Sequence, residues 1–382
     1  MSSDHPGRPL DVDRILADLG VRIIVCCGSG GVGKTTTAAA IALRAAERHG
    51  RRTVVLTIDP ARRLAQSLGL TELDNTPRQV KGIEADESGG ELHAMMLDMK
   101  RTFDEVVLAH TDPARATEIF ANPFYQAMSS TFAGTQEYMA MEKLGQLHAR
   151  GEWDLIVVDT PPSRSALDFL DAPARLSRFL DGRMLRLLLA PARAGGRSMF
   201  SLVTASFGMF SRVVQKVLGA QLLTDLSGFV AALDSMFGGF RQRAEQTYRI
   251  LQARETAFLL VAAPEPDAIR EAAYFAGRLG EERMPLAGLV LNRVHRTAVE
   301  GLSAERSRAA ADELERAGGH DATADALRVH AALAEQAVRE RRVAAAFTDA
   351  YPAVPMVEVA AQPADVHDVD GLRTVGDALS QP

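Results

Sequence analysis

Cysteine is nearly absent from this chain of 382 residues. The two that occur, Cys26 and Cys27, are adjacent, so the sequence offers no disulfide framework and fits a reducing compartment. There is no C-x-x-C pair, and neighbouring residues of a strand point to opposite faces. The nine histidines show no ligand spacing. We therefore expect both cysteines to be apolar strand residues, and we predict no zinc and no other structural metal.

Long apolar segments and a strong excess of one charge are missing as well. In the apolar middle region the longest uncharged stretch, Ser198–Ser211, has 14 residues, which is too short to span a bilayer. The N-terminus lacks the basic and then apolar layout of a signal peptide (MSSDHPGRPLDVDR). A net charge of −6 gives no general attraction to nucleic acid. The composition predicts a soluble, cytoplasmic protein that binds no nucleic acid.

The chain does contain short apolar runs that alternate with helical segments. Hydrophobic residues make up 47% and charged residues 24%, which is typical of a globular protein. Lys34–His49 is predicted to be a helix, and so is the segment 92–150, where Met95, Met99 and Phe103 follow at helical spacing. The alternation predicts an α/β fold with a mostly parallel central sheet covered by helices on both faces. The predicted strands are Arg22–Cys27, Thr53–Ile58, Leu155–Val158, Ala257–Ala263, Leu286–Leu291 and Ala353–Ala360.

A phosphate-binding loop follows the first strand. Residues Gly28–Thr35 have the sequence GSGGVGKT and match the pattern G-x-x-x-x-G-K-[ST]. The glycines let backbone N–H groups face phosphates, Lys34 would reach the β- and γ-phosphates, and the Thr35 hydroxyl would hold Mg²⁺. Only 5 of the 43 basic residues are lysines, so a lysine at this place is informative. The alternative for this segment is a Gly-rich surface turn. Such a turn requires neither the predicted strand before the segment nor the predicted helix after it. The predicted nucleotide-binding residues of the loop are Gly30, Gly31, Val32, Gly33, Lys34, Thr35 and Thr36.

Two aspartates end neighbouring predicted strands. Asp159 closes the run LIVVD, where a second carboxylate of such a site would contact Mg²⁺ through water. Asp59 ends the strand after the loop's helix, at the carboxyl edge where ligands bind in open α/β sheets. A carboxylate there could orient the water that attacks the γ-phosphate. The alternative for Asp59 is an Asp-Pro turn or a helix cap.

Three segments resemble the ATPases that drive arsenite pumps and deliver tail-anchored membrane proteins, the ArsA/GET type. They are GSGGVGKTTTAAAIALRAA, TIDPARRLAQSLG and VVDTPPSRSALDFLDAP, and the likeness runs from about residue 20 onward. The family belongs to the deviant-Walker P-loop class, which also holds partition and division-site ATPases. The resemblance implies a nucleotide-gated dimer with Mg-ATP between two subunits. It also implies that Asp59 and Lys34 are catalytic, and that Thr35 and Asp159 bind Mg²⁺, the latter through water.

The resemblance also assigns residues around the nucleotide. Asn292, in the sequence LVLNR, is similar to the family's adenine-reading Asn, and Gln362–Val366 would flank the base. The switch segments and the loop that faces the partner's nucleotide would contain Ser29, Pro60, Arg62, Arg63, Thr160, Pro161, Pro162, Pro264 and Glu265.

The sequence departs from the family's pattern in three places. Ser29 stands where the deviant loop has its first Lys, which crosses to the partner's phosphates. The zinc-binding C-x-x-C pair that clasps tail-anchored targeting dimers is missing, and so is the Cys cluster that binds metalloid in arsenite pumps. We therefore expect no arsenite transport, and we expect the partner to be a homologous subunit that carries the Lys, in a heterodimer more readily than in a homodimer.

The composition changes between residues 171 and 255, and we interpret this region as an inserted helical subdomain. The domain prediction is an N-terminal extension at 1–20, a P-loop ATPase domain at 21–170 and 256–382, and the insert at 171–255. The Met and Phe residues of the insert either line a groove for a hydrophobic helix or form the subdomain's own core. Residues 175–220 hold seven Arg and one Lys against one Asp, which suits an anionic lipid surface, an acidic partner or a solvated helix face.

Three functions remain open at this point. The first is a molecular switch in which ATP hydrolysis opens and closes a dimer holding a hydrophobic or membrane-associated client, in the cytoplasm or at the inner face of the membrane. The second is a regulatory or structural subunit with low turnover, which Ser29 favours. The third is a partition-type ATPase, which the large insertion and the negative net charge disfavour.

Overall fold

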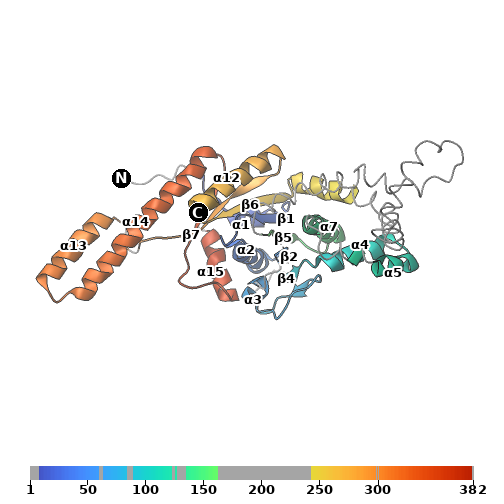
Figure 1. Cartoon of the computed structure of the whole chain (residues 1–382), viewed down its shortest axis with the longest axis horizontal. Helices are drawn as coiled ribbons and strands as arrows, with labels where there is room; N and C mark the ends of the chain where they lie inside the picture. Colours follow the sequence, from blue (N-terminus) through green and yellow to red (C-terminus); the bar gives the residue numbers. More distant parts are fainter. Residues whose placement is uncertain are drawn as a thin grey trace, which may run out of the picture. The chain divides into compact units, whose positions relative to one another are not determined.

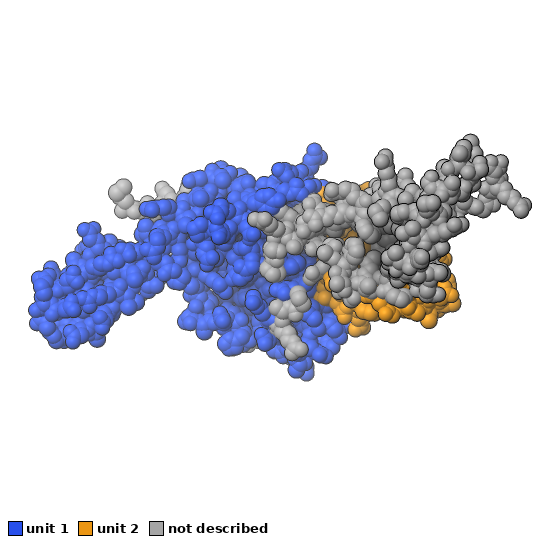
Figure 2. All heavy atoms as spheres, in the orientation of Figure 1, with its two compact units in different colours: residues 1–96, 147–167, 250–382 blue, residues 97–146, 168–249 orange. Residues whose placement is uncertain are grey.

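The chain forms two compact units (Figure 2). The computed structural model describes residues 8–59, 63–83, 89–122, 125–126, 135–161, 242–297, 299 and 301–380. The first unit contains residues 1–96, 147–167 and 250–382, and the second contains residues 97–146 and 168–249. Residues 162–241 lie outside the described ranges, so the boundaries of the predicted insert and its proposed groove stay predictions.

An eight-stranded sheet organises the first unit (Figure 1). Its order is β3-β4-β2-β5-β1-β6-β7-β8. All neighbouring pairs are parallel except β3 with β4. The α/β prediction with a mostly parallel sheet is therefore confirmed. The strands are β1 (Ile23–Cys27), β2 (Arg52–Thr57), β3 (Arg78–Gln79), β4 (Glu91–Met96), β5 (Leu155–Asp159), β6 (Thr256–Ala262), β7 (Leu286–Val294) and β8 (Met356–Ala360).

Helices connect the parallel strands and cover the sheet. Helix α2 (Lys34–His49) links β1 to β2, and α12 (Pro266–Glu281) links β6 to β7 on the other side of β1. Because such crossovers are right-handed, these opposite directions of travel place α2 and α12 on opposite faces. Helix α2 packs against β2, β5 and α15 (Val369–Leu379), whereas α12 packs against β6 and α14 (Asp321–Ala350). The strand order reverses beside β1, which is where open α/β sheets bind ligands.

The predicted helix at 92–150 begins too early. Residues Glu91–Met96 form β4, which pairs in parallel with β2. The helical spacing that starts at Met95 was misleading there, because β2 offers a row of backbone partners that the local pattern does not show. Within the described residues from Met99 onward the structure contains helices, as predicted: α4 (Met99–His110), α5 (Pro113–Ala121) and α7 (Thr135–Arg150).

Helices α13 (Ala304–Ala317) and α14 form a hairpin that extends beyond the sheet (Figure 1). They pack through small buried side chains, Ser307 and Ala311 of α13 and Ala324 and Ala331 of α14. The Ser307 hydroxyl lies 2.9 Å from Nδ1 of His330, which adds a polar contact between the two helices.

The N-terminal segment and the cysteines belong to the core of this unit. Helix α1 (Val12–Ala17) buries Val12 and Leu16, and Leu10 donates its N–H to the carbonyl of Met356 at the start of β8. Cys26 and Cys27 are buried in β1 with free thiols, as expected. Within the described ranges, no helix combines the length and apolarity needed to cross a bilayer.

Candidate functional site

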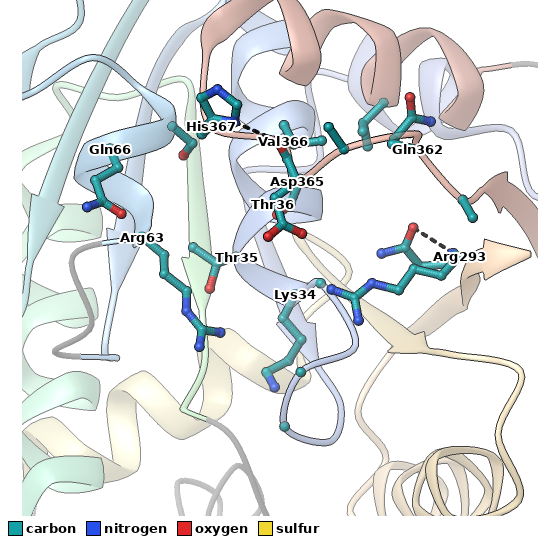
Figure 3. Close-up of a pocket in the computed structure, with 18 of the residues that line it drawn as sticks. Lys34, Thr35, Thr36, Arg63, Gln66, Arg293, Gln362, Asp365, Val366 and His367 are labelled. Carbon is teal, nitrogen blue, oxygen red and sulfur yellow. Dashed lines mark hydrogen bonds between the residues drawn. The ribbon is translucent and has the colours of Figure 1, made fainter.

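A cavity of about 1280 Å³ opens at the carboxyl ends of the central strands. The phosphate loop and the start of α2 line its floor, and the segment after β2 lines one side (Figure 3). The end of β7 and the segments after β7 and β8 line the other side, where Figure 3 shows Arg293 and Gln362 across from Arg63 and Gln66. The predicted loop residues that reach this cavity are Gly30, Gly31, Gly33, Lys34, Thr35 and Thr36.

Two glycines of the loop, Gly28 and Gly33, have no room for a side chain. Gly33 caps α2 in the left-handed region, with φ of +92°, and a Cβ there would meet the side-chain nitrogen of Asn292 at 2.2 Å. At Gly28 a Cβ would lie 2.0 Å from the carbonyl oxygen of Val261 in β6. No side chain caps the first turn of α2, so its N–H groups and helix dipole are available to an anion.

The backbone of the phosphate loop holds the side chain of Lys34. Its Nζ donates to the carbonyl of Ser29 at 2.6 Å, and its side chain is almost fully buried. Burial lowers the pKa of Lys34, while the nearby carboxylate of Asp159 acts in the opposite direction. A phosphate group in the cavity would give this cation a charged partner in place of a neutral carbonyl.

Asp159 lies fully buried at the end of β5, beside the first turn of α2. Its Oδ2 accepts from the hydroxyls of Thr35 and Thr57, both at 2.8 Å, while its Oδ1 is buried and has no hydrogen-bond partner among the described residues. A hydroxyl and a carboxylate with an unused oxygen are the oxygen donors that suit Mg²⁺. The residues present therefore fit a magnesium ion held by Thr35 and Asp159. The described residues contain no group of three His, Cys, Asp or Glu that could hold a metal by themselves.

Thr57 belongs to the site although no sequence motif points to it. It ends β2, and the parallel register places it directly beside Asp159 of β5. Its hydroxyl donates to the carboxylate, and its oxygen accepts at 3.2 Å from the N–H of Asp59. Thr57 therefore joins the two aspartates that the sequence singled out. Only the register of two strands about 100 residues apart could have shown this.

Burial raises the pKa of Asp159 from 3.8 to about 6, although the two threonine hydroxyls lower it. The nucleotide-free folded chain thus keeps this proton in a pH range where the unfolded chain has lost it. The free energy of unfolding should then fall by about 3 kcal/mol between about pH 4 and pH 6 on account of this group. Asp159→Asn cannot titrate, so its stability relative to the wild type should rise by that amount over the same range. Urea unfolding in EDTA measures the difference, and a difference independent of pH would contradict the assignment.

Asp59 and Arg63 face the cavity from the segment after β2. Asp59 is half-buried and lines the cavity together with Lys34 and Thr35. Arg63, at the start of α3 (Arg63–Ser67), is exposed, and its guanidinium points into the cavity (Figure 3). Pro60 and Arg62, which we placed in the same switch, lie outside the described residues, as does Pro162.

Asn292 lies against the phosphate loop. Its Nδ2 donates to the carbonyl of Val32 at 2.8 Å, and its Oδ1 accepts from the N–H of Arg293 at 2.9 Å. The amide nitrogen and the amide oxygen each keep one further hydrogen-bonding position, which a base could use. That Asn292 reads adenine stays a prediction. Val32 itself is buried and serves through its carbonyl, not through its side chain.

Several of the predicted residues do not line the cavity. The Ser29 side chain is not part of the wall, and Pro264 and Glu265 lie at the start of α12, outside it. Thr160 borders the cavity but is buried, with its hydroxyl donating to the carbonyl of Cys26 at 2.8 Å. Pro161 is half-buried. Their roles at a subunit interface stay predictions.

Comparison with known proteins agrees with this geometry. The sequence profile of the anion-transporting ATPases (ArsA ATPases) matches residues 21–311, which is more than half of the chain and includes the loop, both aspartates and Asn292. The chain belongs to this family. The family's match also spans the residues between 162 and 241 that the structure leaves undescribed.

The individual relatives that match this chain have low sequence identity to it. It is 29% identical over 175 residues to the ATPase GET3 of Malassezia globosa and 29% identical over 167 residues to the ATPase ASNA1 homolog 1 of Paramecium tetraurelia. It is 33% identical over 181 residues to protein SCO2128 of Streptomyces coelicolor. These matches cover 45%, 44% and 47% of this chain, and 49%, 48% and 43% of the relatives. The chain thus spans about half the length of the curated relatives it matches.

Proposed function

We propose that this chain binds Mg-ATP in the cavity, hydrolyses it, and uses the cycle to open and close a dimer that handles a hydrophobic or membrane-associated client. The observation that carries the proposal is the group at the end of β5. Thr35, Thr57 and Asp159 place a buried carboxylate with one unused oxygen beside the first turn of the phosphate-loop helix. Membership of the anion-transporting ATPase family supports ATP as the nucleotide.

Each described side chain of the site has a distinct task in this proposal. Lys34 and the N–H groups at the start of α2 bind and orient the phosphates. Thr35 and Asp159 would hold the Mg²⁺ ion that accompanies them. Bound Mg²⁺ would supply positive charge that offsets the negative charge of the β- and γ-phosphates. Asp59 orients water against the γ-phosphate, since it lines the cavity beside Lys34.

Asp59→Asn tests this division of labour. The amide keeps the size of the side chain but loses the charge that orients water, so Mg-ATP affinity should stay within about twofold while hydrolysis slows by about 10²-fold or more. Phosphate release and calorimetric binding measure the two effects. Asp267→Asn, an exposed residue of α12 outside the cavity, is the matched control. Undiminished hydrolysis in Asp59→Asn would remove Asp59 from the mechanism.

The partner in this proposal is a homologous ATPase subunit that carries the Lys missing at Ser29. A subunit of this kind would complete the site of the present chain, while its own site, facing Ser29, would be the weaker one. Ser29 equally supports a second function, a low-turnover regulatory subunit that binds ATP within the same dimer. The two differ in one result, namely whether the paralogue raises hydrolysis at the site of this chain.

The client is the furthest step of the proposal, and it concerns residues outside the described ranges. If the Met and Phe residues of 171–255 form a groove, the ATP-bound protein should keep a hydrophobic helix from aggregating, and Phe207→Asp should abolish that protection. If they form a core, the same change should lower the free energy of unfolding by about 3 kcal/mol or more. Light scattering of the helix and thermal unfolding of the variant decide between these outcomes.

A further inference from the structure

A buried carboxylate of α14 holds the loop that follows β7. Glu340 accepts the backbone N–H of His295 at 2.8 Å, and its other oxygen lies 2.7 Å from Nδ1 of the same residue. Gln336, one turn earlier on α14, donates to Glu340 at 3.0 Å. Nδ1 of His295 also lies 3.0 Å from Nε2 of Gln336. Both the backbone and the side chain of His295 are thus fixed to one buried residue.

The end of β7 and this loop together form a wall of the cavity. Asn292, Arg293 and His295 all line it, and Figure 3 shows the Arg293 guanidinium pointing inward toward the phosphate loop. Arg293 has a φ of +63°, a left-handed conformation that is uncommon for a residue with a side chain. Such a conformation persists where its surroundings hold it on both sides. Asn292 is tied to Val32 of the phosphate loop, and His295 is tied to Glu340.

We propose that Glu340 is a positioning residue for nucleotide binding, and that through it the α13–α14 hairpin senses whether the cavity is occupied. Arg293 is the irregularity of β7 between Asn292 and Val294, and the pairing of β7 with β8 also holds it. Without the two bonds to His295, this bulge loses the anchor that follows it along the chain. Asn292 and Arg293 would then be held less firmly where a nucleotide meets them. This inference rests on the proposed function, because it requires that a nucleotide occupies the cavity.

The position of Glu340 along α14 connects the cavity wall to the α13–α14 hairpin. This helix has 30 residues, and its first half is packed on α13, while Glu340 lies in the part that packs near α12 and β7. A helix transmits a shift of one end to the other because its backbone is continuously hydrogen-bonded. By linkage, a ligand of the cavity that prefers one position of α14 is favoured equally by anything that holds the hairpin there.

The first test is nucleotide affinity. Glu340→Ala should weaken ADP and ATP by the same factor, about tenfold, and raise KM for ATP while kcat changes by less than about twofold, because the lost interaction does not concern the γ-phosphate. Glu340→Gln, which still accepts one hydrogen bond, should lie in between. Glu335→Ala, on the same helix but in an exposed ion pair with Arg308, is the control and should behave as the wild type.

The second test is hydrogen exchange with and without ADP. In the wild type, ADP should slow exchange both in residues 292–297 and in the part of α14 around Gln336, and in Glu340→Gln the effect on α14 should shrink. This variant carries the test if Glu340→Ala does not fold. Unchanged affinity and unchanged protection of α14 in a folded variant would overturn the inference alone. A wild type that binds neither ADP nor ATP would instead overturn the proposed function.

Discussion

Hydrolysis by this chain alone should be slow and should rise about 10³- to 10⁵-fold when a Lys-bearing paralogue is added, which is the range known for cations supplied in trans to a phosphoryl group. The reason is Ser29, whose side chain does not line the cavity and whose carbonyl is already engaged by Lys34. A hydroxyl is uncharged and too short to act across an interface. Phosphate release at fixed subunit concentrations measures the gain.

Two variants make this expectation specific to the site of the present chain. Asp59→Asn here should remove most of the gain, because in the proposed heterodimer the Lys of the paralogue would act on the nucleotide bound by this chain. Replacing that Lys in the paralogue should do the same. The main competitor is a cation from within the switch, since Arg63 points into the cavity (Figure 3). Full activity of the isolated chain that survives Arg62→Ala and Arg63→Ala would contradict the prediction.

Lys34→Ala should weaken Mg-ATP binding by about 2 kcal/mol or more, roughly 30-fold, because a charge-assisted contact to the phosphates is lost. In the free chain the ammonium is buried and donates to the neutral carbonyl of Ser29, so a phosphate is its stronger partner. Displacement of a fluorescent ATP analogue measures the loss. Lys100→Ala, which removes an exposed lysine paired with Asp104, should bind as the wild type does. Equal affinity in both variants would exclude Lys34 from the site.

The sequence predicts the floor of the cavity better than its walls, for a physical reason. The phosphate loop is a local structure, in which glycines, Lys34 and Thr35 lie within eight residues and the helix start follows directly. The alternation of buried strands and helices likewise predicts the parallel sheet. In contrast, the local spacing predicts a helix where β4 lies, because this strand depends on its pairing with β2.

The parts that sequence reasoning missed all depend on distant residues. Thr57 is brought to Asp159 by strand register, and Glu340 reaches His295 from 45 residues further along the chain. Asn292 was singled out for the base, whereas the structure also shows it bonded to the phosphate loop. Such contacts follow from topology, since a side chain's own sequence neighbourhood says little about which strand or helix will lie beside it.

The most direct test of the central claim, a Mg-ATP site at the phosphate loop, is a calorimetric titration with ATP in the presence of Mg²⁺ and again in EDTA. For the wild type we expect one nucleotide per chain and an affinity that Mg²⁺ raises by about tenfold or more, since Thr35 and Asp159 present the oxygen donors that this ion prefers. In Asp159→Asn the two titrations should nearly coincide. If Mg²⁺ changed the affinity of both proteins equally, or of neither, the assignment of the buried carboxylate to the metal end of the site would be wrong.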